Sequence, residues 1–252
     1  MSLDHVVLEG TGRPRVVVLG VPSWTQTALP FVEALAAGHP TLAIASMQSD
    51  PPEPSWAELC AQVERLVTSF STEPVDLVGL SFGGALALQC LVRDVLPVRS
   101  AVLAVTAARF RARERGLIAT LQSIVCSELP ARGLVDGLLP MLLSPDFLHR
   151  PGYMGVLRAQ LEGDLGSARL VWGQRLALLA THDVRRSLGE LHRVDRVITA
   201  EQDWLFPPSE SKLLADGLPN AELRTVPGGH AVWLESRDAF VELVHEAWKH
   251  AA

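Results

Sequence analysis

Continuous apolar runs recur along the first hundred residues, separated by segments in which apolar positions follow helical spacing. Such runs are typical of strands buried on both faces, as in a parallel sheet. The strand candidates are 6–8, 15–19, 41–45, 75–80 and 98–105, and the helix candidates between them are 27–37, 55–70 and 82–92. This order predicts an α/β fold with a mostly parallel, doubly wound sheet and helices on both faces.

The segment 107–189 has a different pattern, because helical spacing continues while strand candidates are absent. Prolines and glycines interrupt the segment, and it is rich in apolar residues. The sheet pattern then returns, with strands expected at 196–200 and 222–226 and helices at 208–216 and 237–249. We therefore expect a core domain of residues 1–106 and 190–252. Residues 107–189 should form a helical cap inserted between the strands near Val105 and Val197.

The composition fits one large α/β domain and argues against several classes of partner. The 252 residues are 48% hydrophobic, and the formal net charge of -6 without a basic run disfavours nucleic acid or an anionic membrane as partner. There is no signal-peptide pattern and no segment of the roughly 20 apolar residues that a membrane span needs. Cys60, Cys90 and Cys126 lack metal-ligand spacing. We expect a soluble cytoplasmic monomer or homodimer, without a metal or cofactor.

A glycine-rich turn between a strand and a helix carries the first candidate catalytic residue. The run Gly79-Leu80-Ser81-Phe82-Gly83 begins at the end of the strand expected at 75–80. In this setting G-x-S-x-G is typical of a sharp turn that exposes a nucleophilic serine, for which the glycines supply room. Ser81 is therefore the candidate nucleophile, although a turn with an incidental serine has the same local pattern.

A serine nucleophile needs a base, and the base needs a carboxylate that orients it. Asp203 and His230 each follow a strand expected in the last third of the chain. Parallel strands end at the same edge of a sheet, so both side chains should lie near Ser81. Asp203 could also be an ordinary turn residue, with Glu201 as the alternative acid, and His230 could be a surface histidine.

With these three motifs in this order, nearly the whole chain resembles a capped α/β-hydrolase of the esterase or lactonase kind. The resemblance implies that Ser81, Asp203 and His230 form a catalytic triad. It further implies that the main-chain N–H groups of Phe82 and Val21 form the oxyanion hole.

Two loops depart from the family pattern. Many relatives carry His-Gly at the end of the first central strand, where this chain has Leu19-Gly20. Relatives often show an Asp-x-x-Gly-x-Gly turn where this chain continues from Ser46 into a proline-rich segment.

Large apolar side chains stand close in sequence to the candidate catalytic residues. Trp24 and Trp204, in loops at the active edge, and Met141 in the cap are the candidates for a pocket wall, whereas Trp233 and Phe206 are expected in the core. These residues indicate a small-molecule substrate with an apolar or aromatic acyl part.

Several polar cap residues are expected to have no part in the site. Arg158, Arg175 and Arg185 could reach inward, but a solvated face of the cap is the expectation for each. His182 is expected to be structural.

Together these features favour a serine hydrolase that cleaves a carboxylic ester, lactone or thioester. A C–C bond hydrolase or an acyl transferase would use the same residues. A non-hydrolytic binding or cyclase-like protein of the same fold is the alternative of another class.

Overall fold

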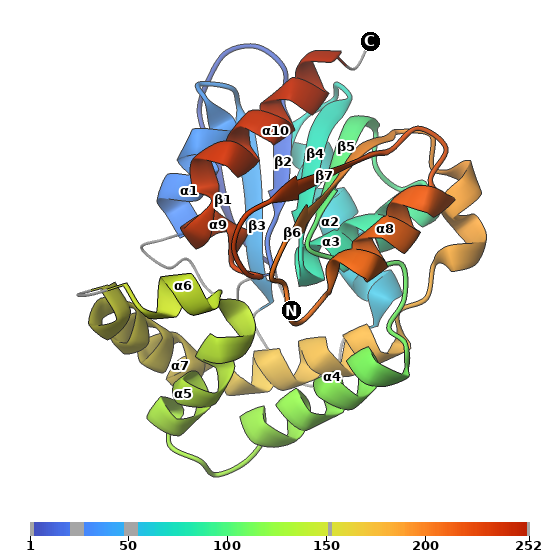
Figure 1. The fold of residues 1–252 in the computed structure, drawn as a ribbon. Coiled ribbons are helices and arrows are strands. Elements are labelled where there is room, and N and C mark those ends of the chain that lie inside the picture. The colour runs from blue at the N-terminus through green and yellow to red at the C-terminus, as the bar shows by residue number, and fades with distance from the viewer. Residues whose placement is uncertain (1–2, 21–27, 48–54, 151–152, 251–252) are drawn as a thin grey trace.

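A seven-stranded sheet forms the centre of the computed structural model, which describes residues 3–20, 28–47, 55–150 and 153–250 (Figure 1). The strand order is β1-β3-β2-β4-β5-β6-β7; β1 runs antiparallel to β3, and every other neighbouring pair is parallel. The strands are β1 Leu3–Leu8, β2 Arg15–Val18, β3 Thr41–Met47, β4 Val75–Leu80, β5 Val98–Ala104, β6 Val194–Ala200 and β7 Glu222–Val226. The predicted mostly parallel, doubly wound α/β sheet is confirmed.

The central strands are buried on both faces, as their continuous apolar sequences predict. Val16 and Val18 of β2 belong to one apolar cluster and Val17 to the other, because successive side chains of a strand point to opposite faces. β1 differs, since after the buried Leu3 its residues alternate between half-buried and exposed positions at the edge of the sheet. An edge strand with one solvated face does not need a long apolar run, which explains why only its last three residues are evident in the sequence.

Helices cover both faces of the sheet. On one face α1 (Ala28–Ala36) and α10 (Arg237–His250) meet, and the rings of Phe31 and Phe240 lie 5.5 Å apart (Figure 1). The opposite face is covered by α2 (Trp56–Phe70), α3 (Phe82–Val92) and α8 (Pro208–Gly217). This arrangement leaves the carboxyl ends of the parallel strands as the edge where a site can form.

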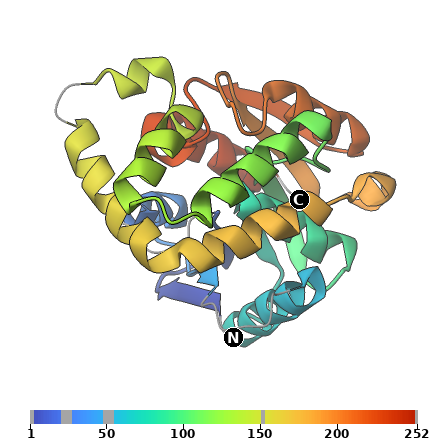
Figure 2. The ribbon, with the colours of Figure 1, turned by 90° about the horizontal axis from the view of Figure 1, so that it is seen from below.

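Four helices between β5 and β6, which we call the insert helices, lie across that edge (Figures 1 and 2). They are α4 (Ala112–Val125), α5 (Ala131–Leu142), α6 (Pro145–Leu148) and α7 (Tyr153–Thr181), and α7 packs against both α4 and α5. Among the described residues of 107–189 there is no strand, only an isolated bridge between Arg109 and Asp183. A 3-10 helix, Arg185–Glu190, leads back to β6.

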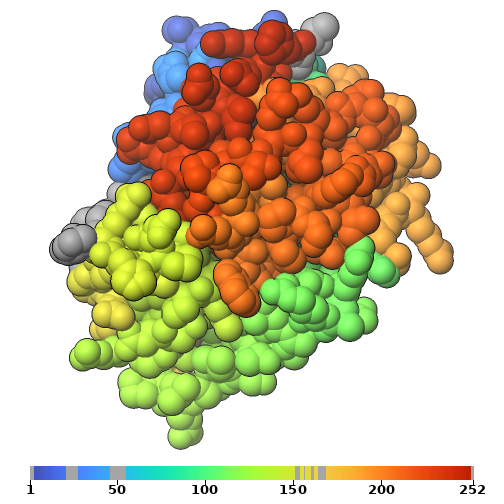
Figure 3. Space-filling view, in the orientation of Figure 1, coloured from blue at the N-terminus to red at the C-terminus, as the bar shows by residue number. Residues whose placement is uncertain are grey.

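The insert helices pack directly against the last third of the chain. The space-filling view shows them in contact with the segments that follow β6 (Figure 3).

None of the helices within the described ranges combines the length and apolar character needed to cross a membrane.

Candidate active site

The turn that presents Ser81 is tight and strained. Ser81 has φ 55° and ψ -121°, a main-chain conformation that residues other than glycine rarely adopt. A Cβ at Gly83 would lie 2.1 Å from the carbonyl oxygen of Val18, and one at Gly79 would lie 2.8 Å from the Cβ of Ala87. Side chains at these glycines would collide with β2 and α3, so the G-x-S-x-G spacing follows from how closely the turn packs.

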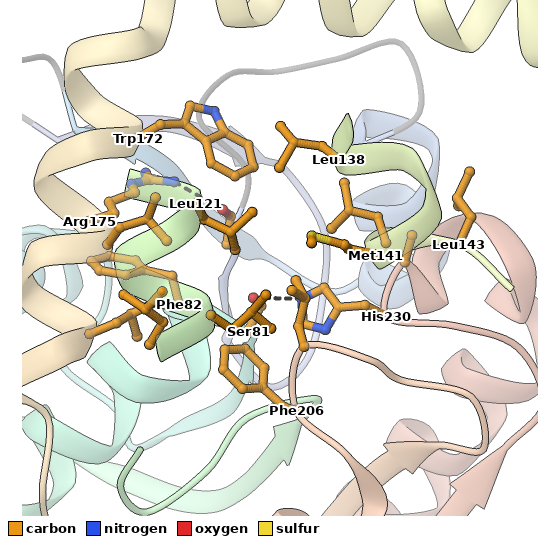
Figure 4. A pocket seen from close by; sticks show the side chains of 18 of the residues that line it. Ser81, Phe82, Leu121, Leu138, Met141, Leu143, Trp172, Arg175, Phe206 and His230 are labelled. Atoms are coloured by element: carbon orange, nitrogen blue, oxygen red, sulfur yellow. Dashed lines mark hydrogen bonds between the residues drawn. The ribbon is translucent and has the colours of Figure 1, made fainter. Parts of the chain in front are cut away.

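Three side chains form a continuous hydrogen-bonded chain at the carboxyl ends of β4, β6 and β7. His230 Nε2 lies 2.8 Å from Ser81 Oγ, and His230 Nδ1 lies 2.8 Å from Asp203 Oδ2 (Figure 4). Asp203 and His230 are only 3% and 2% exposed, whereas Ser81 is partly accessible. The structure therefore brings together the three residues that the sequence placed at one sheet edge, and it leaves the serine hydroxyl open to a ligand.

The two oxygens of Asp203 have separate functions. Oδ1 accepts the main-chain N–H groups of Leu205 and Phe206, both at 2.9 Å, which leaves Oδ2 to face His230. Asp203 is thus a turn residue and the partner of the histidine at once. Glu201, the alternative acid, is exposed. The Phe206 ring meets the His230 ring edge-on, 5.3 Å between centroids, and shields the imidazole from water.

A carboxylate that the sequence analysis missed holds the loop of His230. Glu235, in the short helix α9 (Val232–Glu235), accepts the N–H of Gly229 at 3.1 Å on Oε1. The same oxygen accepts the N–H of Ser144 at 2.9 Å, and the Ser144 hydroxyl donates to Oε2. Glu235 therefore joins the loop before the histidine to the start of α6.

The histidine loop also contacts the insert helices directly. The N–H of Ala231 donates to the carbonyl of Leu142 at 2.9 Å. A Cβ at Gly229 would lie 2.7 Å from the Ser144 nitrogen, so only glycine fits there. No local sequence pattern marks Glu235, because its partner in the insert lies 91 positions away along the chain.

A mainly apolar cavity lies between the sheet edge and the insert helices, with Ser81 and His230 in its wall (Figure 4). The insert supplies most of the remaining wall. Apolar side chains that line it include Leu121, Leu138, Met141, Leu143, Trp172 and Phe206. Such a wall favours a ligand with an apolar body that reaches the serine hydroxyl.

The structure shows which of the large apolar residues expected near the site line the cavity. Met141 lines the cavity as predicted, but Trp204 is 61% exposed and lies outside it. The turn made by Asp203 explains this, because it directs the side chains of Leu205 and Phe206 into the cavity and leaves Trp204 at the surface. Phe206 lies in the apolar core as expected and also lines the cavity, and Trp233, half-buried against the core, lines the cavity too. Trp24 lies outside the described residues.

The residues just after β2 lie beside Ser81. A Cβ at Gly20 would stand 2.8 Å from Ser81 Cβ and 3.1 Å from the nitrogen of Phe82, the first residue of α3. The N–H of a first helical residue has no partner within its helix and is free to meet a developing negative charge. Leu19, which replaces the histidine of many relatives, is buried in the core. Val21, the other expected oxyanion donor, lies outside the described residues.

One insert arginine behaves differently from the expectation of a solvated face. Arg175 of α7 is buried, and it donates to the carbonyls of Gly20 at 3.0 Å and Ala45 at 2.8 Å. Its guanidinium lies 4.9 Å from the ring centroid of Phe82, and burial lowers the pKa of Arg175 to about 9. Arg158 and Arg185 have about half of their side chains exposed, as expected for a solvated face, and each pairs with an aspartate.

His182 is buried away from the cavity. Its Nδ1 lies 3.0 Å from Gln89 Nε2, and its Nε2 lies 3.0 Å from the Ala107 carbonyl. Burial lowers the pKa of His182 to about 4, so the ring is neutral at neutral pH. Within the described ranges, no three His, Cys, Asp or Glu side chains are grouped to hold a metal ion.

A parallel sheet whose strand–turn–helix presents a hydrogen-bonded serine beneath inserted helices defines the class of α/β-hydrolases. The model of the alpha/beta hydrolase family matches residues 16–243, and the chain belongs to that family of enzymes.

Curated and solved relatives agree with this assignment. A pimeloyl-[acyl-carrier protein] methyl ester esterase of Chromobacterium violaceum is 28% identical over 177 residues, which is 69% of each chain. Among solved structures, an alpha/beta hydrolase enzyme from a Medee basin deep-sea metagenome library has a TM-score of 0.87 at 20% identity, covering 99% of this chain and 95% of that one. The enol-lactonase of Burkholderia xenovorans has a TM-score of 0.85 at 19% identity, covering 98% and 96%.

Proposed function

We propose that the protein is a serine hydrolase that cleaves a carboxylic ester, lactone or thioester of a small to medium, largely apolar substrate. The observation that carries the proposal is the hydrogen-bonded chain from Asp203 through His230 to Ser81, in the wall of an apolar cavity. Nucleophile, base and orienting acid have the mutual geometry that acyl transfer requires.

In the proposed reaction, Ser81 Oγ attacks the substrate carbonyl while its proton passes to His230 Nε2. The tetrahedral oxyanion is held by the N–H of Phe82, with the N–H of Val21 as the second donor that the family resemblance implies. The imidazolium, stabilised by Asp203, protonates the leaving alcohol or thiol, and an acyl-enzyme remains. A water molecule then gives its proton to His230 and attacks the acyl group, which releases the acid and restores Ser81.

The class of substrate is inferred from the cavity wall and from the named relatives. An apolar wall desolvates the reacting carbonyl and strengthens the polar interactions made with it. One relative is named for cleaving a methyl ester and a structural neighbour for an enol-lactone, both of which are carboxylic esters in the chemical sense. We also propose that residues 107–189 serve as a cap over the bound acyl group and that the enzyme acts on a small molecule in the cytoplasm.

The remaining candidates use the same residues or fewer of them. A C–C bond hydrolase or an acyl transferase would need the same triad, and no contact among the described residues favours either over ester cleavage. A non-hydrolytic binding protein would not require two hydrogen bonds of 2.8 Å that align an acid, a base and a hydroxyl.

A fluorophosphonate probe tests the proposal directly, because it labels only activated serines. We expect the wild-type protein to be labelled at Ser81 and to hydrolyse neutral p-nitrophenyl esters, and the Ser81→Ala variant to do neither. A folded wild-type protein that stays unlabelled and inactive towards esters would contradict the proposal. The variant Ser123→Ala, at an exposed hydroxyl of α4, is the control and should be labelled like the wild type.

A further inference from the structure

Arg175 stands apart from the other buried arginines of the described residues. Three buried arginines have an Nε without a hydrogen-bond acceptor: Arg15, Arg175 and Arg196. Two of the three have carboxylates close by, Asp76 for Arg15, and Glu222 and Glu246 for Arg196. Within the described part of the chain Arg175 has only carbonyl oxygens and an aromatic ring as partners. Among the described residues, then, no carboxylate pairs with this buried cation.

Burying a guanidinium in this way lowers the stability of the fold unless further partners bind it. A buried charge needs an opposite charge or a full set of hydrogen bonds to offset the loss of water. The two described hydrogen bonds of Arg175 use two of its five N–H donors. Its lowered pKa reflects the same unbalanced burial. An anionic group bound beside the guanidinium would supply an opposite charge and accept hydrogen bonds from the remaining N–H groups.

The place where that anion would lie is the cavity that contains Ser81. Arg175 contributes to the cavity wall between Trp172 and Phe82, on the side opposite Met141 (Figure 4). Besides Arg175 and His230, the charged or titratable residue that lines it among the described residues is Glu114. The Glu114 carboxylate is already bound by Arg113 and by the N–H of Arg111.

From this geometry we propose that Arg175 determines specificity by binding a carboxylate carried by the substrate. The natural substrate is then an ester, lactone or thioester with an apolar body and one carboxylate group. Arg175 donates to the carbonyl of Gly20, which lies against Ser81, and its guanidinium lies over the ring of Phe82, the residue after Ser81. A carboxylate bound by Arg175 would therefore lie close to the bond that is cleaved. This inference rests on the proposed hydrolase function and names the substrate class for it.

Matched pairs of esters test the proposal. Monomethyl adipate and monomethyl glutarate carry a carboxylate on the acyl side, and methyl hexanoate and methyl pentanoate are their neutral counterparts of equal length. Butyryl glycolate and ethyl butyrate form the corresponding pair for the alcohol side. We expect the wild type to prefer the anionic member of one kind of pair by about 10- to 100-fold in kcat/KM, mainly through KM, because a charge-assisted hydrogen-bonded pair is worth that much.

Variants on α7 locate the preference. Arg175→Met should abolish the discrimination, measured as the ratio of kcat/KM between the two members of each pair in the same variant, and Arg175→Lys, which keeps the charge but not the planar fork, should retain part of it. Arg169→Met is the matched control, because Arg169 also donates to two carbonyls, those of Ser127 and Leu129, away from the cavity. It should preserve the preference.

A binding measurement separates this inference from the hydrolase proposal. In a Ser81→Ala background, which removes the nucleophile, adipate should raise the thermal midpoint of unfolding and neutral adipamide should not, and Arg175→Met should cancel the difference. Equal kcat/KM for anionic and neutral esters, with no stabilisation by adipate, would overturn the inference and leave the hydrolase intact. Adipate binding that depends on Arg175 in a protein without esterase activity or labelling would retain the anion site and refute the hydrolase.

Discussion

Glu235 binds Ser144 through two contacts, the main-chain N–H at 2.9 Å and the side-chain hydroxyl, and thereby joins the loop of His230 to the insert helices. Its Oε1 also holds the N–H of Gly229, the residue before the histidine. The proposed base is therefore positioned from two sides, by Asp203 on its ring and by Glu235 on its loop. A change in the insert at α6 would be transmitted to His230 through this carboxylate.

We expect Glu235→Ala to lower kcat roughly tenfold or more, because the loop of His230 loses the acceptor that fixes it and small displacements of a base are costly. Two N–H groups would also lose their partner, so the free energy of unfolding should fall by about 2 kcal/mol.

Steady-state kinetics with chemical denaturation check both effects. Glu235→Gln keeps an acceptor in place, so its losses of kcat and of stability should be smaller than those of Glu235→Ala. Ser144→Ala removes the hydroxyl contact but not the N–H contact, and should lie between the wild type and Glu235→Ala. Unchanged kcat in Glu235→Ala would show that the loop is held without the carboxylate.

Two glycine-to-alanine changes should have opposite effects on stability. A Cβ at Gly83 meets the carbonyl of Val18 at 2.1 Å, so Gly83→Ala must displace either β2 or the turn of Ser81. We expect it to unfold the protein or to abolish fluorophosphonate labelling. Gly116 lies inside α4 with nothing within 4 Å of the added carbon. Gly116→Ala should raise the free energy of unfolding by roughly 0.5–1 kcal/mol.

Thermal or chemical unfolding of the two variants, with labelling of each, decides the matter. An active and fully stable Gly83→Ala would mean that the turn is looser than its contacts indicate. A destabilised Gly116→Ala would mean that this part of α4 is not exposed helix.

The sheet and the serine turn were predictable because their signals are local. The apolar runs of β2 to β5, the glycines around Ser81 and the chain order of the motifs can each be read over a few residues. That Phe206 lines the cavity and Trp204 does not was not predictable in this way, because the Asp203 turn decides which of the neighbouring side chains points inward.

Features that depend on the packing of the insert helices were missed for the same reason. Arg175 looks like any solvated arginine of a helix until α7 is laid against the ends of β2 and β3. Glu235 and Ser144 come together only when α6 meets the histidine loop. Contacts of this kind join residues that are far apart in sequence, and no periodicity or motif records them.

Asp203→Asn separates the two functions of Asp203. Asparagine keeps an oxygen for the N–H groups of Leu205 and Phe206, but it presents an NH₂ group to His230 and favours the wrong tautomer of the ring. We expect kcat to fall roughly ten-thousand-fold with little change in stability. Asp203→Ala should lose the turn as well, and its free energy of unfolding should fall by about 2 kcal/mol.

The two Asp203 variants are compared by single-turnover kinetics and by denaturant unfolding. Equal losses of stability would indicate that the turn does not depend on Oδ1. Nearly full activity in Asp203→Asn would contradict the assignment of Asp203 as the residue that orients His230, and Glu201→Gln, at an exposed carboxylate, serves as the control that should stay active.

His182 should make the protein less stable in mild acid. Arg93 donates to the Gln89 side-chain oxygen, so the Gln89 NH₂ group faces Nδ1 of His182, and Nε2–H can donate to Ala107. This pattern suits only the neutral ring, and burial, opposed by the Ala107 bond and by Asp183, lowers the pKa of His182 to about 4 in the folded state.

The unfolded chain has the ordinary histidine pKa, so between about pH 6.5 and pH 4 the unfolded state binds the proton that the folded state excludes. The contribution of the neutral His182 to the free energy of unfolding is therefore fully present above about pH 6.5. It declines by roughly 3 kcal/mol as the pH falls towards 4. Denaturant unfolding at several pH values should show a shallower pH dependence for His182→Gln than for the wild type. His149→Gln, at an exposed histidine, should keep the wild-type slope, and equal slopes in all three proteins would mean that His182 takes up its proton without unfolding.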